Sequence, residues 1–198
     1  MKTKLGIYGG TYAPVHNGHI RAAIEFKDQF ELDRLLIIPT SVSPHKAMPA
    51  GDSALHRYNM LKLAFEGYER IEVSDYELNK EGKSYTVETL RHFSSPATEL
   101  YFLCGTDMLL SMHTWYKADE IATLATLVYT RRETDTSLDS RIEQQISFLR
   151  SELGFKIKEM IMEPLELSST VVRKAKDRSS YLPPAVDRYI KENNLYVQ

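Results

Sequence analysis

Short apolar runs alternate along the chain with stretches in which apolar residues recur every three or four positions. The continuous runs predict buried strands, and the longer spacing predicts amphipathic helices. We expect strands at 4–8, 34–38, 71–73, 100–103, 127–129 and 155–162. We expect helices at 18–30, 53–66, 85–93, 107–112, 118–125, 138–153, 168–176 and 186–192. This order predicts an α/β fold with a single doubly wound parallel sheet and closing helices at the C-terminus.

The end of the first predicted strand carries the clearest candidate chemistry. The strand ends at Gly9 and Gly10, and His16 and His19 follow just before a predicted helix. Backbone N–H groups at a glycine turn and a helix start can bind an anion, and imidazoles can donate to phosphate oxygens. We therefore predict a phosphate site here. Two other interpretations stay open: His16 and Asn17 as plain helix caps with His19 on the surface, and a His-x-x-His metal pair.

Length and charge narrow the classes of function. A chain of 198 residues without internal repeat, low-complexity block or linker fits a single domain spanning 1–198. It has 25 Lys and Arg residues against 27 Asp and Glu residues, and the resulting net charge of −2 argues against nucleic acid as a partner. A local basic pocket for a small phosphate ligand is compatible with this balance.

The chain has a single cysteine and no long apolar segment. Cys104 alone excludes an intramolecular disulfide and a thiolate zinc cluster, and its apolar neighbours predict a buried small hydrophobe. No apolar run approaches the roughly 18 residues that a membrane helix needs, and the N-terminal residues do not form a signal peptide. We therefore expect a cytoplasmic protein with no membrane partner.

A loop without apolar periodicity follows the second predicted strand at 40–52 and contains the pair His45-Lys46. Loops of this length are usually functional or mobile, and a cationic pair after a buried strand could close over a triphosphate. The alternative is that Lys46 is a solvated loop charge. The residues alone leave both interpretations open.

A predicted helix near the C-terminus begins with three hydroxyl side chains and carries a cation one turn later: Ser168, Ser169, Thr170 and Arg173. Hydroxyl and backbone donors at a helix start, with a guanidinium beside them, suit a phosphate group. The same residues would also serve as an ordinary N-cap. The pattern alone supports both interpretations equally.

Two blocks in the middle of the chain combine aromatic and polar side chains. In the first, Ser84 is the predicted N-cap of a helix that Tyr85 and Thr86 begin, and the spacing alone favours a capped, packed helix. In the second, Asp107 follows a buried strand, where it is either an N-cap or a group that faces a nucleotide. Trp115, the single tryptophan, is more typical of a core than of a ligand contact.

These blocks resemble the signatures of one superfamily. The residues Gly9-Gly10-Thr11-Tyr12-Ala13-Pro14-Val15-His16-Asn17-Gly18-His19 resemble the Gly-Gly-Thr/Ser-Phe-x-Pro-x-His-x-Gly-His signature of the nucleotidyltransferases. The residues at 168–173 are similar to the second signature, Ile-Ser-Ser-Thr-x-x-Arg, with Leu167 in place of Ile. More narrowly, the chain looks like a bacterial nicotinate mononucleotide adenylyltransferase. It departs from the pattern at Tyr12, where Phe is usual, and at Ala13, where Asp is usual.

The resemblance implies a Rossmann-like nucleotidyltransferase fold and a reaction in NAD biosynthesis. That reaction transfers AMP from ATP to nicotinate mononucleotide and gives deamido-NAD and pyrophosphate. Mg²⁺ would bind through the ATP phosphates, without ligands from the protein. The alternatives are adenylyl transfer to phosphopantetheine or to nicotinamide mononucleotide, and a nucleotide-sensing module without catalysis. The sequence leaves open whether the chain forms a homo-oligomer and how strongly it prefers the acid over the amide.

The resemblance also assigns roles to individual residues. It implies a catalytic set in which histidines donate to phosphates and cations hold the leaving pyrophosphate: His16, His19, Lys46 and Arg173. It implies ATP contacts from Gly9, Gly10, Thr11, His16, His19, Gly105, Asp107, Arg131, Ser168, Ser169, Thr170 and Arg173. It implies contacts to the mononucleotide from Tyr12, His45, Lys46, Tyr85, Thr86, Trp115 and Tyr116. The indole of Trp115 would stack on the pyridine ring, and the backbone of Thr86 and Tyr116 would recognise its carboxylate.

Overall fold

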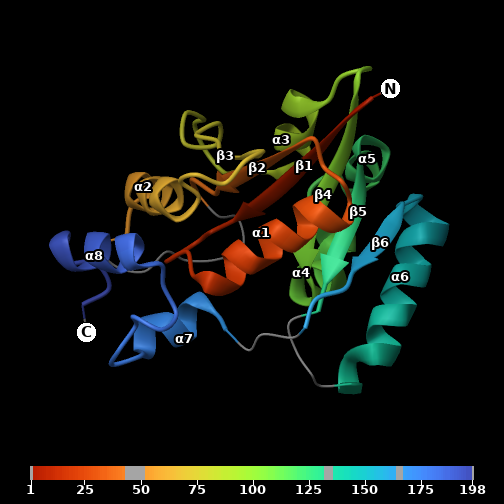
Figure 1. Ribbon diagram of the computed structural model, residues 1–198. Coiled ribbons are helices and arrows are strands. Elements are labelled where there is room, and N and C mark those ends of the chain that lie inside the picture. The colour runs from red at the N-terminus through yellow and green to blue at the C-terminus, as the bar shows by residue number, and fades with distance from the viewer. Residues whose placement is uncertain (1, 43–51, 132–135, 164–166, 198) are drawn as a thin grey trace.

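The computed structural model describes residues 2–42, 52–131, 136–163 and 167–197. Within these ranges, six strands form one sheet, and all five neighbouring pairs are parallel. The strands are β1 (Thr3–Gly10), β2 (Arg34–Pro39), β3 (Ile71–Val73), β4 (Thr98–Gly105), β5 (Ala125–Thr130) and β6 (Ile157–Met160), in the order β3-β2-β1-β4-β5-β6 (Figure 1). The predicted doubly wound parallel sheet is therefore confirmed.

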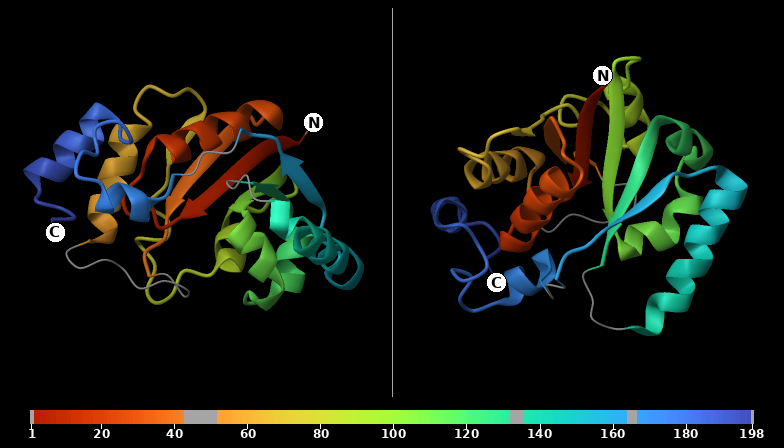
Figure 2. Two further views of the ribbon diagram at one scale, coloured as in Figure 1. Left: turned by 90° about the horizontal axis from the view of Figure 1, so that it is seen from below. Right: turned by 45° about the vertical axis from the view of Figure 1, so that its right-hand side comes forward.

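Helices cover both faces of this sheet (Figures 1 and 2). They are α1 (Asn17–Gln29), α2 (Ala54–Ala64), α3 (Thr86–Phe93), α4 (Thr106–Ser111), α5 (Ala118–Leu124), α6 (Asp139–Leu153), α7 (Ser169–Lys174) and α8 (Pro184–Glu192). The second half of the chain also contains two 3-10 turns: Met112–Thr114 lies between α4 and α5, and Thr136–Leu138 directly precedes α6. Each predicted helix is present, with ends that differ from the predicted ones by a few residues.

Alternate residues of the central strands enter two separate hydrophobic cores. In β2, Leu35 and Ile37 pack in the core beneath α1, α2 and α8. Leu36 and Ile38 of the same strand pack in the core beneath α3, α4, α5 and α6. All four side chains are at most 2% exposed. Burial on both faces explains why these strands are continuous apolar runs rather than alternating ones.

The strand order reverses direction between β1 and β4, and each of these two strands ends in a glycine. From β1 the chain proceeds to β2 and β3 on one side, and β4 then returns to pair with the other edge of β1. Gly10 ends β1 and Gly105 ends β4, so both turns leave the sheet at its carboxyl edge. Such a reversal is the place where open α/β sheets bind ligands.

The structure can be compared with three further predictions from the sequence, which concern Ser84, Cys104 and membrane-spanning helices. Ser84 does not cap α3: Tyr85 is the residue before the helix, and the Ser84 Oγ instead accepts the Ser41 N–H at 3.2 Å. Cys104 is buried, as predicted. Among the described residues, no helix is both long and apolar enough to cross a membrane.

Gly6 of β1 occupies a position where a side chain has no room. A Cβ atom there would lie 2.4 Å from Cδ1 of Leu32 and 2.9 Å from Cδ1 of Leu35, both fully buried. We expect Gly6→Ala to lower the free energy of unfolding by about 1–3 kcal/mol through overpacking, as measured by urea unfolding. Gly9→Ala is the control, because its Cβ would meet only Phe102, at an ordinary 3.8 Å. Equal stability of Gly6→Ala and wild type would contradict this packing argument.

Candidate functional site

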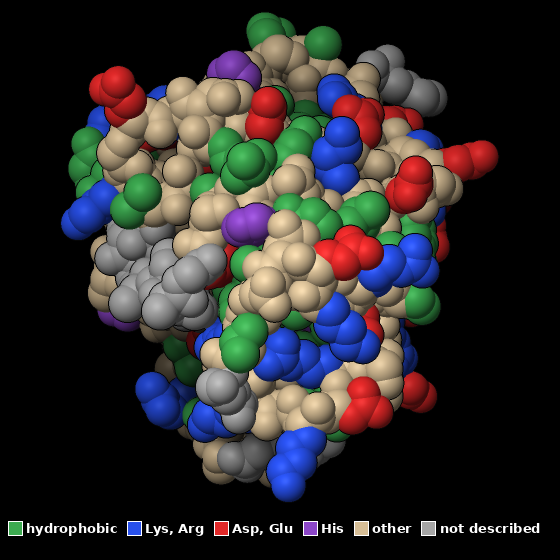
Figure 3. Space-filling model, turned by 90° about the vertical axis from the view of Figure 1, so that its left-hand side faces the viewer, with side chains coloured by type: hydrophobic (Ala, Val, Ile, Leu, Met, Phe, Trp, Pro, Cys, Tyr) green, Lys and Arg blue, Asp and Glu red, His purple; other side chains and the backbone are tan. Residues whose placement is uncertain are grey.

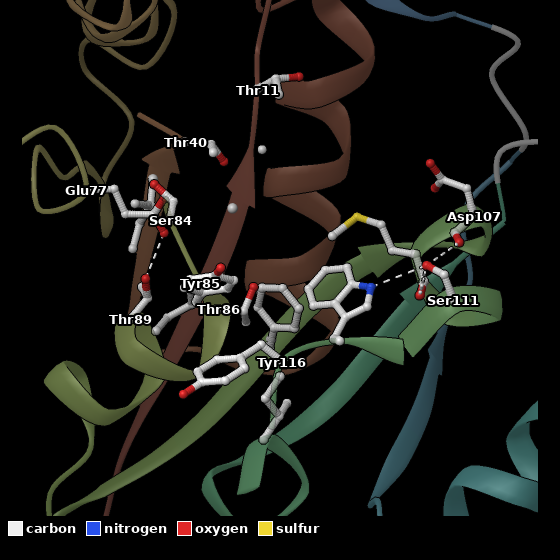
Figure 4. Close-up of a pocket in the computed structure, with 18 residues that line it drawn as sticks. Thr11, Thr40, Glu77, Ser84, Tyr85, Thr86, Thr89, Asp107, Ser111 and Tyr116 are labelled. Atoms are coloured by element: carbon white, nitrogen blue, oxygen red, sulfur yellow. Dashed lines mark hydrogen bonds between the residues drawn. The ribbon is translucent and has the colours of Figure 1, made fainter. Parts of the chain in front are cut away.

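A cavity of about 190 Å³ lies at the point where the strand order reverses. Its walls combine the ends of β1 and β2 with α3, α4 and the segment before α5 (Figure 4). Four aromatic rings line it: Tyr85, Phe102, Trp115 and Tyr116. The polar lining residues are Thr11, Thr40, Glu77, Ser84, Thr86, Thr89, Asp107 and Ser111. Within the described ranges, the charged residues of this lining are both carboxylic acids and none is a cation.

The aromatic rings are held by contacts with one another and with the side chain of Ser111 in α4. The indole Nε1 of Trp115 donates to the Ser111 hydroxyl at 3.3 Å, and the indole meets the Phe102 ring edge-to-face, with centroids 6.2 Å apart. The rings of Tyr85 and Tyr116 lie 4.8 Å apart at a tilt. A planar ligand with an apolar face would fit against such a wall by stacking.

Glu77 places a buried carboxyl at one side of the cavity, beside Ser84 and Thr89 (Figure 4). Its Oε1 accepts the Thr89 hydroxyl at 2.7 Å, and the residue is 7% exposed. Burial raises the pKa of Glu77, while hydrogen bonds from Thr89 and Ser84 and the nearby Lys80 oppose that rise. The carboxyl thus joins the segment after β3 to the first turns of α3.

The two histidines lie beyond the glycine turn and contact each other directly. His16 precedes α1, and its ring stacks on that of His19 with centroids 3.7 Å apart. The backbone N–H of His16 donates to Nδ1 of His19 at 3.3 Å. Because that nitrogen accepts, the neutral imidazole of His19 carries its proton on Nε2. Both residues are at least nine-tenths buried, so His19 is not a surface helix residue.

Helix α7 packs on the loop that leads to the histidines. The Arg173 guanidinium donates to the carbonyl oxygen of Ala13, and the Ser169 hydroxyl donates to that of Pro14 at 2.9 Å. Ser168 caps the helix by accepting the Val171 N–H at 3.2 Å. The two stretches that resemble nucleotidyltransferase signatures therefore meet in space, although they come from opposite ends of the chain.

Other predicted site residues lie at varying distances from the cavity. Asp107 lines it from the first turn of α4, whose N-cap is Gly105 rather than Asp107. Tyr12 is 2% exposed and lies outside the lining, and its hydroxyl donates to the carbonyl oxygen of Tyr8 at 2.7 Å. Arg131 follows β5 and pairs with Asp139 at 2.6 Å. The predicted residues His45 and Lys46 lie outside the described residues.

The lining also contains polar residues that the sequence interpretation did not select. Thr40, Glu77 and Ser111 each lie on a different segment, and only the parallel sheet brings those segments together. No spacing in the sequence could have linked them. In the part of the chain that the structure describes, no cluster of three or more His, Cys, Asp or Glu side chains could hold a metal ion.

Comparisons with known proteins place the chain in a family. The model of the family described as "Cytidylyltransferase-like" matches residues 7–175. The chain belongs to this family. A Clostridium botulinum protein (strain Eklund 17B / Type B) named "Probable nicotinate-nucleotide adenylyltransferase" is 36% identical over 197 residues, which is 98% of each chain. A Desulfatibacillum aliphaticivorans protein of the same name is 34% identical, over 98% of this chain and 100% of that one. These family members confirm the resemblance predicted from the sequence.

A solved structure confirms the fold of this family member. The Plasmodium falciparum nicotinic acid mononucleotide adenylyltransferase complexed with NaAD superposes with a TM-score of 0.77 at 18% identity, covering 99% of this chain and 98% of that one. At that identity the likeness concerns the fold alone. The Rossmann-like nucleotidyltransferase fold that the resemblance implied is therefore confirmed.

Glu77 should make stability depend on pH. Burial raises its folded-state pKa above the ordinary 4.5, so its contribution is fully present below pH 4.5 and is lost as pH rises through the folded pKa. We expect Glu77→Gln to gain stability relative to wild type between about pH 4 and pH 8, as measured by urea unfolding.

Glu72→Gln is the control for this measurement. A hydrogen bond from Arg34 lowers the pKa of Glu72, so its contribution is present above pH 4.5 and lost as pH falls. As pH rises, Glu72→Gln should therefore lose stability relative to wild type. The change should be small, because the Arg34–Glu72 pair is exposed. A pH-independent difference between Glu77→Gln and wild type would overturn the assignment of a raised pKa.

Proposed function

We propose that this chain transfers AMP from ATP to the 5′-phosphate of nicotinate mononucleotide, giving deamido-NAD and pyrophosphate in NAD biosynthesis. One arrangement carries the proposal: the aromatic cavity opens beside the glycine turn, and that turn leads to the stacked histidines on which α7 packs. A flat base and a polyphosphate would thus lie at adjoining parts of one site. The names of the close relatives support the same activity.

The cavity is proposed to hold the pyridine ring of the mononucleotide. The indole of Trp115 stacks on that ring, and the backbone N–H groups of Thr86 and Tyr116 bind the carboxylate. The described lining offers no cationic side chain, so neutral donors would select the acid over the amide. His45 and Lys46 complete the mononucleotide site. For Tyr12, burial beneath the turn favours support of the His19 ring, 5.0 Å away, over direct contact.

The loop after β1 and the start of α7 are proposed to hold the phosphates of ATP. Lys and Arg side chains gather on the lower part of the face that carries α2, α7 and α8, despite the net charge of −2 (Figure 3). Lys174, the last residue of α7, and Lys176, two residues further on, are exposed and add positive charge near that helix. The proposed ATP contacts are those that the resemblance implied: Gly9, Gly10, Thr11, His16, His19, Gly105, Asp107, Arg131, Ser168, Ser169, Thr170 and Arg173.

The proposed mechanism relies on positioning and charge stabilisation. The attacking phosphate is already ionised near neutral pH, so no general base is required. His16 and His19 donate to phosphate oxygens, and Nε2 of His19 is the nitrogen that can donate in the neutral ring. Lys46 and Arg173 stabilise the leaving pyrophosphate. Mg²⁺ would bind mainly through phosphate oxygens and water and neutralise the polyphosphate, in keeping with a described site that offers no carboxylate cluster.

We also propose that residues 1–198 act as one nucleotidyltransferase domain in the cytoplasm. Support comes from the two cores, which pack against opposite faces of the same sheet. The substrates enter from solution, and neither nucleic acid nor a membrane takes part. A homo-oligomer is compatible with this proposal but not needed by it.

Pyrophosphate release from ATP tests the proposed function against its rivals. The purified chain should release pyrophosphate fastest with nicotinate mononucleotide, more slowly with nicotinamide mononucleotide, and not with phosphopantetheine. Faster release with either rival substrate would reassign the acceptor. Release with none of the three would favour a nucleotide-sensing module.

Replacing His19 should abolish most turnover, because the site loses a buried phosphate donor. We expect His19→Ala to lower kcat by roughly 10²–10³-fold, as for loss of one oxyanion donor. His92→Ala is the matched control: His92 is an exposed histidine of α3 that stacks on Tyr76, and it should turn over like wild type. Near-normal turnover of a folded His19→Ala variant would remove this histidine from the mechanism.

A further inference from the structure

The side chain of Arg57 on α2 is buried, yet it has no place in the mechanism above. The residue is 1% exposed. Its guanidinium donates to the carbonyl oxygen of Thr11 at 2.8 Å and to that of Ser41 at 3.3 Å. Its Nε lies 3.6 Å from Oδ2 of Asp52, whose side chain is fully buried. One cation therefore connects α2 to the segment after β1 and the segment after β2, and it also pairs with the residue just before the N-cap of its own helix.

Burying this cation costs desolvation free energy, so its presence inside the protein calls for a structural reason. Desolvation lowers the pKa of Arg57, and the charges of Asp52 and Glu77 oppose that effect. A buried ion pair generally adds little net stability compared with apolar side chains of similar size. Two different nitrogens of the planar guanidinium reach these two carbonyl oxygens, an arrangement that the single ammonium nitrogen of a lysine does not reproduce. Arg57 thus holds the two carbonyl oxygens in a specific geometry, which is more than a charge attraction to Asp52 would do.

The geometry that Arg57 preserves belongs to the turn after β1. Thr11 lines the cavity, and the neighbouring Gly10 carbonyl oxygen accepts the Thr40 N–H at 2.9 Å. The next residue, Tyr12, has a φ of 51°, a conformation that side chains other than glycine rarely adopt. Backbone of this kind persists where its surroundings hold it in place. The bond from Arg57 to the Thr11 carbonyl is such a restraint, applied one residue before the strained position.

We propose that Arg57 is a positioning residue for adenylyl transfer. By binding the carbonyl oxygens of Thr11 and Ser41 together, it fixes the turn after β1 against the segment after β2. It thereby sets where the cavity wall ends and where the loop to His16 begins. A shift of this turn would misalign the two reacting phosphates without removing any group that touches them. This inference rests on the proposed function, because the effect of replacing Arg57 is measured as a change in the rate of adenylyl transfer.

The test compares Arg57→Lys and Arg57→Ala with wild type and with Lys62→Gln, a control at an exposed position of the same helix. Arg57→Lys keeps the charge but replaces the two separate guanidinium nitrogens with one ammonium nitrogen on a flexible stem. We expect kcat to fall roughly 10–100-fold in both variants, with much smaller changes in KM, because misplacement of reacting groups acts on the transition state. Methylguanidinium should restore part of the kcat of Arg57→Ala, and methylammonium should not. Lys62→Gln should match wild type.

Each outcome bears on one proposal only. Circular dichroism and the unfolding midpoint establish the folded fraction, and where Arg57→Ala does not fold, Arg57→Lys decides alone. A folded variant with kcat within about twofold of wild type would overturn the positioning role, even if its stability is lower. A fall in kcat that methylguanidinium does not reverse, in a folded Arg57→Ala, would also count against it. Absence of turnover in wild type would instead refute the proposed function.

Discussion

The parallel pairing of β1 along both of its edges is the constraint on which the site depends. β1 is hydrogen-bonded to β2 on one side and to β4 on the other, so its carboxyl end cannot shift along the sheet. The chain leaves β1 toward one edge and returns beside it from the other. The turn at Gly9 and Gly10 is therefore fixed between two crossovers, with a cavity at its side and a helix start beyond it.

The loop after β1 has its carbonyl oxygens bound from outside. Those of Gly10 and Thr11 accept from Thr40 and Arg57, and those of Ala13 and Pro14 accept from α7. Carbonyl oxygens turned toward a phosphate would repel it, so engaging them elsewhere favours an anion site electrostatically. The donors come from three distant parts of the chain, which makes this local electrostatic property a product of the whole fold.

Hydrophobic periodicity and sequence motifs were enough to predict the fold and many of the site residues. They did not predict the buried polar contacts, which depend on residues far apart in the sequence. The strand at Arg34–Pro39 was predictable because both of its faces are apolar, and the histidine loop because it combines glycines with imidazoles. The contact of Glu77 with Thr89 has no periodic signal, and Arg57 binds backbone carbonyls that any sequence would offer. The expected cap at Ser84 was wrong because its hydroxyl accepts from a residue far away along the chain.

The docking of α7 onto the histidine loop has a consequence for synthesis of the chain. Ser169 and Arg173 bind carbonyl oxygens of Pro14 and Ala13, so the two halves of the proposed phosphate site lie 155 and 160 residues apart along the chain and are synthesised at different times. Domains fold as units once enough of the chain has emerged from the ribosome. A nascent chain could pair β1 with β2 early and yet hold no complete site. The proposed nucleotide binding would then begin only after α7 has been synthesised and has packed on the histidine loop.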